Sequence, residues 1–151
     1  MLRWIRRALG MLLALALAAT VLAWWLLRGS LPRLDGELAL PGLQAPVAVR
    51  RDALGVVTIE AASAADAVRA LGFVHAQECY FEMDLMRRAA AGELSALLGP
   101  VALRADRARR VHRMRARVEA ALPAFAGDRA DHLQAYAEGA NAGLAALRVR
   151  P

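Results

Sequence analysis

The sequence predicts an α+β fold that is mostly helical and contains one β-hairpin, and three observations support this. Two short β-rich runs lie within residues 45–61, separated by a break that contains Asp and Gly. After Ser63, apolar residues recur at helical spacing. Before both lies a long apolar run within the first 30 residues. We therefore expect three parts, namely a membrane or export segment over 1–30, a linker over 31–44, and one modest domain over 45–151.

The N-terminal segment has the pattern of a membrane anchor. Three arginines (Arg3, Arg6 and Arg7) precede the uncharged run Ala8–Leu27, and Arg28 follows it. About 20 residues of helix rise about 30 Å, enough to cross a bilayer core. The arginine bias predicts that the N-terminus stays inside, so that the body lies in the periplasm or another extracytoplasmic space, held to the inner membrane by residues 8–27.

A cleaved signal peptide is the competing interpretation of this segment. The triplets Ala14–Ala16 and Ala16–Ala18 have small residues at cleavage-site spacing. The apolar run continues past them to two tryptophans, Trp24 and Trp25, which suit a membrane interface. We therefore expect an uncleaved signal-anchor, and both interpretations predict an exported body.

Composition excludes some classes of function. All 20 basic residues are arginine, and of the formal charge of +6 the four arginines that flank the apolar run supply four, which leaves +2 for the rest. A nearly neutral body gives little support to nucleic-acid binding. The single cysteine, Cys79, can form neither a disulfide within the chain nor a cysteine-based zinc site.

The β-rich runs are expected over Val47–Arg51 and Val56–Ala61, joined by Asp52–Gly55. Alternation in the first run and turn residues in the break predict a hairpin. An isolated two-stranded hairpin is marginal in water. We therefore expect its strands to pair with others that this chain does not contain.

The helices follow in order. Ser63 with Asp66 three residues later predicts a helix start, followed by a stripe of Val68, Leu71, Gly72, His75, Cys79, Met83 and Met86. Gly92 and Gly99-Pro100 punctuate two shorter helical pieces. A further stripe comprises Val111, Met114, Val118, Leu122 and Phe125. Gly127-Asp128 opens the last helix, with an expected face of Leu133, Tyr136, Ala137, Ala140, Leu144 and Leu147.

The stretch Gly72–Arg88 is the first candidate site. His75, Glu78, Cys79 and Glu82 lie on one side of a helix and are all of metal-ligating types. One helix rarely completes a metal site, so the favoured alternative is a packed histidine and an inert thiol in the apolar stripe.

Acidic residues of the same stretch also suit a structural role. Glu78 and Glu82 are like charges at i, i+4, whereas Asp84 and Arg88 have the stabilising sign. We expect acids matched by arginines rather than a general acid/base pair.

An arginine-rich run and the three serines are the other candidate sites. The run Arg104–Arg117 holds seven arginines, but Asp106 with Arg110 and Arg115 with Glu119 form i, i+4 pairs, which favours a solvated helix face over a phosphate site. The serines are Ser30 in the linker region, Ser63 as a helix cap, and Ser95 on a helix with no neighbouring histidine. No catalytic triad can be assembled from them.

The order of these motifs resembles the start of the penicillin acylase (penicillin amidase) family of N-terminal nucleophile hydrolases. The resemblance runs from about Leu43 to Leu147, through "VRRDALGVVTIEAAS", "DAVRALGFVHAQECYFEMDLMRRAAAGEL", then Asp106, Arg109 and Arg110, and finally "AYAEGANAGL". The chain departs from the family pattern at Val57, Cys79, Glu82 and Ala96, where Pro, Arg, Gln and Glu are usual. The Cys79 departure removes a cation beside Glu78 and Glu82.

The resemblance implies a periplasmic amidase made as one precursor. It implies that residues 45–151 belong to the smaller α segment of an αββα fold, and that self-cleavage releases a β segment whose first residue is the serine nucleophile. That serine, the oxyanion-hole groups, the ligands of a possible calcium ion and the acyl pocket would all come later than Pro151. No catalytic, cofactor-binding or metal-binding role is therefore assigned to any residue here. Gly72–Arg88 is then expected to be a scaffold helix.

The resemblance implies a hydrolase that cleaves carbon–nitrogen bonds in linear amides, of which this chain is an inactive N-terminal portion. Its expected partners are the β segment of the same precursor, a small amide substrate and the membrane, with no nucleic acid. The alternative is a small membrane-tethered helical interaction module, or a relic without activity. The third hypothesis is a metal-binding protein that uses His75 or Cys79.

Overall fold

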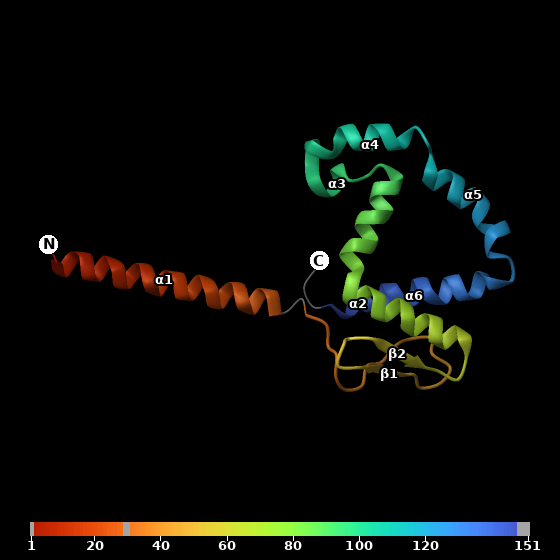
Figure 1. Cartoon of the computed structure of the whole chain (residues 1–151), viewed down its shortest axis with the longest axis horizontal. Coiled ribbons are helices and arrows are strands. Elements are labelled where there is room, and N and C mark those ends of the chain that lie inside the picture. Colours follow the sequence, from red (N-terminus) through yellow and green to blue (C-terminus); the bar gives the residue numbers. More distant parts are fainter. Residues whose placement is uncertain (1, 29–30, 148–151) are drawn as a thin grey trace. The chain divides into compact units, whose positions relative to one another are not determined.

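The computed structural model describes residues 2–28 and 31–147, and its elements are a long N-terminal helix, one two-stranded sheet and a series of helices (Figure 1). The chain divides into two units, one that contains α1 and one over Glu37–Ala146. Its elements are α1 (Leu2–Arg28), β1 (Ala48–Arg51), β2 (Val57–Glu60), α2 (Ala64–Ala91), α3 (Ser95–Leu98), the 3-10 turn η1 (Gly99–Ala102), α4 (Leu103–Arg110), α5 (Met114–Ala126), η2 (Gly127–Arg129) and α6 (Ala130–Ala146). This confirms the mostly helical α+β prediction.

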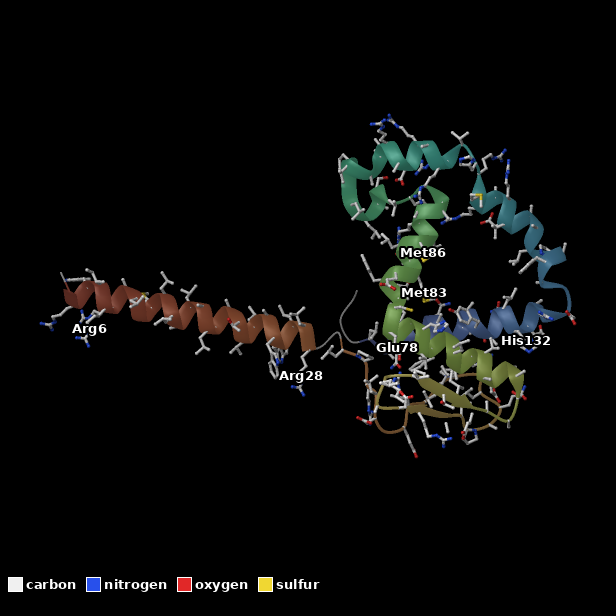
Figure 2. The ribbon with its side chains drawn as sticks, viewed as in Figure 1. Arg6, Arg28, Glu78, Met83, Met86 and His132 are labelled. Carbon is white, nitrogen blue, oxygen red and sulfur yellow. The ribbon has the colours of Figure 1, made fainter. Side chains whose placement is uncertain are left out.

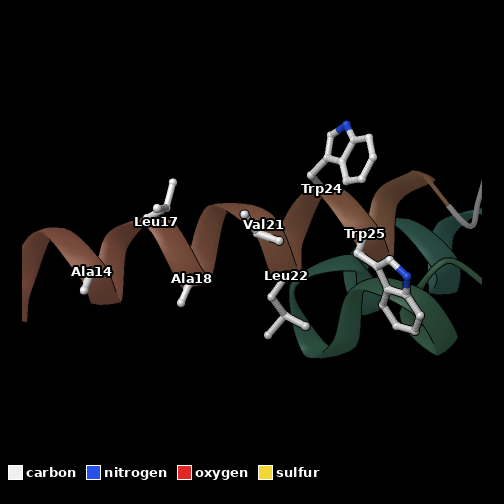
Figure 3. Close-up of a pocket in the computed structure, with 7 residues that line it drawn as sticks. All are labelled: Ala14, Leu17, Ala18, Val21, Leu22, Trp24 and Trp25. Carbon is white, nitrogen blue, oxygen red and sulfur yellow. The ribbon is translucent and has the colours of Figure 1, made fainter.

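α1 is long and apolar enough over Arg3–Arg28 to cross a membrane, and its most apolar window is wholly unburied. The hydroxyl of Thr20 is satisfied within the helix, since its Oγ1 donates to the carbonyl oxygen of Ala16 at 2.8 Å. Near its end the Arg28 guanidinium lies 4.9 Å from the Trp24 ring centroid. Figure 3 shows a shallow apolar groove along one side of this single helix, lined by Ala14, Leu17, Ala18, Val21, Leu22, Trp24 and Trp25. The helix is compatible with a membrane anchor and with a signal sequence.

The hairpin has the predicted strands and turn. β1 and β2 pair antiparallel, with Val49 opposite Ile59 and Arg51 opposite Val57. The turn is fixed by Asp52, whose carboxylate accepts from the backbone N–H groups of Leu54 and Val56 at 2.9 and 2.8 Å. Among the described residues no third strand joins this sheet. Both strands therefore expose an unpaired edge.

α2 begins and ends where the sequence predicts. The Ser63 hydroxyl accepts from the Asp66 backbone N–H at 3.1 Å, which confirms the N-cap. At the other end Gly92 adopts a left-handed φ of 71°, and its N–H and the Glu93 N–H bond back to the last turn. Inside the helix the backbone of Cys79 leaves helical geometry, with φ −144° and ψ 28°. This kink divides α2 into two straight halves with different directions (Figure 1).

The core lies where the first half of α2 crosses α6, and its residues are small. Gly72 of α2 and Gly139 and Gly143 of α6 are buried at the crossing. A Cβ at Gly72 would lie 2.2 Å from the Tyr136 carbonyl oxygen, a distance that no real Cβ contact reaches. Ala70, Val74 and Ala76 of α2 and Ala135 of α6 are buried on the same two helices. Glycine and alanine thus let two backbones approach closely, rather than large side chains filling a space between them.

Both predicted apolar faces of these helices are wrong in detail. On α2 the predicted stripe includes Leu71 and Met86, which are 37% and 73% exposed. The kink at Cys79 rotates the second half of the helix, so the stripe does not continue to Met86 on the same face. Leu71 lies before the kink, where the buried positions are small residues such as Ala70 and Gly72. On α6 the predicted Leu133 is 42% exposed, and the buried face is instead the one that carries Ala135, Gly139 and Gly143. The two backbones approach so closely that only small residues fit between them, so residue size rather than hydrophobicity determines which face is buried.

The connection between α2 and α6 forms an arch of α3, α4 and α5 (Figure 1). Gly99-Pro100 starts the turn η1, as expected from the punctuation of the sequence. The apolar stripe predicted from Val111 onward is split, because α4 ends at Arg110 and α5 begins at Met114. Between them Arg113 adopts a left-handed conformation with φ 50°.

Candidate functional site

The candidate residues on α2 serve as ties to neighbouring elements. Glu78 lies on the side of α2 toward the hairpin (Figure 2), and its carboxylate accepts from Arg51 of β1, with Nη2 to Oε1 at 2.9 Å. Arg51 is half-buried and Glu78 more exposed, at 20% and 41% of their side chains. This ion pair holds the hairpin on α2. Glu78 therefore has an arginine partner from the hairpin, although its neighbour in the chain is Cys79.

His75 faces α6. Its Nδ1 lies 2.9 Å from the Tyr136 hydroxyl, and the two rings meet edge to face at 5.8 Å between centroids. Burial raises the pKa of Tyr136, so its hydroxyl stays protonated and available as a donor. The pair satisfies two polar groups at the edge of the helix crossing. This agrees with the expectation of a packed histidine.

Cys79 lies at the kink, and its thiol bonds to the helix itself. Its Sγ donates to the carbonyl oxygen of His75, one turn earlier, at 3.2 Å. A thiol that back-bonds to a carbonyl one turn earlier resembles the serine and threonine contacts that accompany bent helices. Among the described residues no group of three or more His, Cys, Asp and Glu side chains could hold a metal ion.

Asp84 confirms the expected ion pair with Arg88. Arg88 Nε donates to Asp84 Oδ2 at 2.6 Å, and Arg87 approaches the other carboxylate oxygen. Hydrogen bonds from Arg88 and then Arg87 hold the pKa of Asp84 below its usual range. Glu82 is exposed and takes part in no ion pair among the described residues. In this half of α2, Asp84 is therefore matched by two arginines of the same helix.

Asp66 is the first of two fully buried carboxylates, with 1% exposure. The backbone N–H of Gln44 donates to its Oδ1 at 3.0 Å, which joins the segment before the hairpin to the start of α2. That bond, more than any other interaction, holds the pKa of Asp66 below its usual range, against the opposing effect of burial. Its Oδ2 is buried with no hydrogen-bond partner among the described atoms.

Arg69, one turn later, extends this network to α6. Its guanidinium forms an ion pair with Glu138, and the side chain is 14% exposed. Gln134 also donates to Glu138, at 2.9 Å. The start of α2 is thereby fastened to both the incoming chain and α6.

Asp106 is the second buried carboxylate, again with 1% exposure. It accepts from the backbone N–H groups of Leu94 and Ser95 at 2.9 and 2.7 Å, the first donors of α3. Burial acts to raise the pKa of Asp106, but hydrogen bonds from Ser95 and Leu94 outweigh it and lower the pKa. Asp106 thus caps α3 from a different helix.

The ion pairs expected in the arginine run are different from those observed. Arg110 Nε donates to the carbonyl oxygen of Gly92 at 2.8 Å instead of bonding Asp106, whose oxygens are used by α3. Arg115 pairs with Glu93 at 2.7 Å instead of Glu119. Tertiary neighbours therefore replace the local i, i+4 pairs. All seven arginines of this run are exposed, which agrees with the prediction of a solvated helix face.

The three serines occupy unlike positions. Ser30 lies outside the described residues. Ser63 is the N-cap of α2, and the Ser95 backbone is bound by Asp106. The described residues bring no histidine into hydrogen-bonding contact with either serine. This does not test the expectation that the chain holds no nucleophile, which stays a prediction.

The comparisons with known proteins agree with the resemblance seen in the sequence. The family model described as penicillin amidase matches residues 46–151. The chain is 45% identical over 119 residues to the Penicillin acylase 2 proenzyme of Pseudomonas sp. (strain SE83), a match that covers 79% of this chain and 15% of that protein. It is 36% identical over 115 residues to the Acyl-homoserine lactone acylase QuiP of Pseudomonas aeruginosa, covering 76% of this chain and 14% of that one.

A solved structure shares the fold. The thermostable penicillin G acylase from Alcaligenes faecalis superposes with a TM-score of 0.60 at 32% identity, over 68% of this chain and 55% of that chain. The chain spans only 15% of the length of the curated acylase it matches at 45% identity. With the family model matched over residues 46–151 and the α2–α6 core inside that range, the chain belongs to the penicillin amidase family.

Proposed function

We propose that this chain is the N-terminal portion of a penicillin acylase-like hydrolase that cleaves carbon–nitrogen bonds in linear amides. The single observation that carries the proposal is the family match over residues 46–151, joined to relatives named as acylases. Those relatives are far longer, since the match covers 14–15% of each. The catalytic serine would then lie beyond this chain.

In the complete enzyme the chemistry would be acyl transfer through serine. The serine oxygen attacks the amide carbonyl, its proton passes to the departing nitrogen, and the carbon–nitrogen bond breaks to leave an ester. Water then cleaves the ester and releases the acid. A serine at the first position of a released β segment could use its own α-amine as the base, because the reference pKa of that amine is about 8.

The role proposed for the present chain is structural. Arg51 with Glu78, and Arg69 with Glu138, fasten the hairpin and α6 to α2. Such a body would form the α segment of an αβ assembly, with β1 and β2 extended by strands of the β segment. A calcium ion in the complete enzyme is suggested by the resemblance alone, and its ligands would also come from the β segment.

α1 supports an exported location. A helix that can span a membrane precedes the acylase domain, and its described arginines lie at both ends. We propose that it directs the domain to the periplasm and anchors it in the inner membrane. A fusion of alkaline phosphatase after Gly36 would be active if the domain is exported. An inactive fusion, present in normal amount, would contradict export.

The experiment that tests the proposed activity begins with the gene. An open frame of several hundred codons beyond Pro151, with a serine that becomes a new N-terminus, is expected. The protein from that frame should hydrolyse phenylacetyl, glutaryl or long-chain acyl amides, whereas the 151-residue chain should hydrolyse none. An immediate stop codon would leave the interaction module or relic as the surviving function. Turnover by the purified chain that is lost on replacing Ser30, Ser63 or Ser95 would overturn the assignment of its residues to a scaffold.

A further inference from the structure

The C-terminal end of α1 carries a second groove, the Arg28 groove, which combines apolar walls with a cation. It is lined by Trp24, Leu27, Arg28, Leu31 and Pro32. The chain folds back here, because the Leu31 backbone N–H donates to the carbonyl oxygen of Arg28 at 3.3 Å. The side chains of Trp24, Leu27 and Leu31 are 56%, 69% and 69% exposed. The described part of the chain therefore leaves these apolar walls open.

Arg28 has an aromatic contact but no acidic partner among the described residues. Its guanidinium carbon lies 4.9 Å from the Trp24 ring centroid, within cation–π distance. The first acidic residue of the sequence is Asp35, so no carboxylate side chain comes from α1 itself. The Trp24 ring covers one face of the planar guanidinium, and the N–H groups at its edge stay available to an acceptor. A guanidinium edge matches the paired oxygens of a phosphate group.

The length of α1 determines the depth of this groove in a bilayer. About 20 helical residues rise about 30 Å, the thickness of the hydrocarbon core. Arg28 is the first charged residue after the uncharged run Ala8–Leu27. When α1 spans the membrane, Arg28 therefore lies at the level of the lipid headgroups, with Trp24 one turn deeper.

We propose that the Arg28 groove binds an anionic phospholipid. Arg28 donates to the oxygens of the phosphodiester, and the apolar walls of the groove contact the upper part of the acyl chains. Charge complementarity and depth both favour this ligand. The proposal rests on the membrane anchoring by α1 given under Proposed function, and it adds the chemical class of ligand and the residues that bind it.

Other phosphate-bearing ligands fit the groove less well. A dissolved phosphate ion has the same charge, but it gains nothing from the apolar walls formed by Leu27, Leu31 and Pro32. A zwitterionic lipid such as phosphatidylcholine has its own cation beside the phosphate, which competes with Arg28. Phosphatidylglycerol has no such cation, so we expect the groove to prefer it.

Fluorescence quenching at Trp24 measures this preference where the lipid would bind. With Trp4→Phe and Trp25→Phe, the 151-residue chain keeps Trp24 as its only tryptophan. In bilayers that contain brominated phosphatidylglycerol or brominated phosphatidylcholine, we expect Trp24 to select phosphatidylglycerol about fivefold, the factor for one arginine at an anionic surface. Equal quenching by the two lipids would overturn the site and leave the anchor standing. Quenching by neither lipid would refute the anchor and the site together.

A soluble competitor separates a lipid from a dissolved anion. The preference should be the same in sodium phosphate as in sodium chloride of equal ionic strength. Its loss in sodium phosphate alone would overturn the proposal in favour of a site for a dissolved anion.

Substitutions in the same single-tryptophan chain test the role of Arg28. Arg28→Gln should reduce the lipid preference to about one, because the charge is gone. Arg6→Gln removes the same charge near the other end of α1 (Figure 2) and should leave the preference at Trp24 unchanged. Arg28→Lys keeps the charge without the planar edge and should keep only part of the preference. Equal behaviour of Arg28→Gln and Arg6→Gln, or a full preference in Arg28→Lys, would refute the proposed site.

Discussion

The backbone of Gly139 on α6 lies against the carbonyl oxygen of Arg69 on α2. A Cβ at position 139 would stand 1.9 Å from that oxygen, which is backbone and cannot swing aside. The same residue, Arg69, forms the ion pair with Glu138, the neighbour of Gly139. Close approach and electrostatic pairing thus fix the α2–α6 crossing at one place in the chain.

Gly139→Ala is expected to destabilise the body strongly. The added methyl group must push the two helices apart, and overpacking of this kind costs about 1–3 kcal/mol or more. The measurement is urea denaturation of the chain in mild detergent, followed by far-UV circular dichroism. Ala137→Ser, which adds one heavy atom at an exposed position of α6, is the control and should change the free energy of unfolding by about 0.5 kcal/mol or less. If the two variants unfold alike, the close crossing is absent in solution.

Glu78→Gln is expected to loosen the hairpin. It removes the charge that pairs with Arg51, an interaction of partly exposed groups worth about 1 kcal/mol or less. Amide exchange in β1 and β2 should accelerate, while exchange in α6 should stay unchanged. The matched control is Glu82→Gln, which alters an exposed carboxylate on the next turn. Unchanged exchange in the strands of the Glu78→Gln variant would mean that this ion pair does not hold the hairpin.

Asp106→Asn is expected to weaken the start of α3. An amide can still accept one backbone N–H through its oxygen, but its NH₂ group would face the second donor. The Leu94 and Ser95 amides should lose protection from exchange, and the unfolding midpoint should fall. Asp128→Asn, at an exposed position in η2, serves as the control and should leave both quantities unchanged. Retained protection at Ser95 would show that Asp106 is not its acceptor.

The free energy of unfolding is expected to fall in acid, because three carboxylates of the folded chain become protonated. The pKa values of Asp66, Asp84 and Asp106 are all lowered in the folded chain. A lowered folded pKa contributes stability that is present above the unfolded value, about 3.9, and is lost as pH falls below about 4 through the folded value. Thermal unfolding measured from pH 7 to pH 2 should show this decline. The double variant Asp66→Asn with Asp106→Asn should start lower and show a flatter decline; a parallel curve would exclude these two carboxylates as its cause.

Much of the local structure was predictable because the chemistry of each element is local. Ser63 caps α2 and Asp52 closes the hairpin turn, each through bonds within four residues. Asp84 and Arg88 pair one turn apart. The partners of Asp106 and Arg115 could not be predicted in this way, because they lie at the start of α3 and in the short connection between α2 and α3, more than ten residues away in the chain.

The sequence alone determined the order and type of the elements, including the apolar N-terminal helix, since periodicity, caps and turn residues act over a few neighbouring positions. The resemblance of its ordered motifs, rather than their periodicity, indicated the penicillin amidase family. Only the tertiary structure decided which faces are buried. Periodicity marks large apolar side chains such as Leu71 and Leu133, yet the α2–α6 crossing buries glycine and alanine, because backbones that approach this closely select for small size. The large apolar residues are left on the outside, where another part of a protein can cover them.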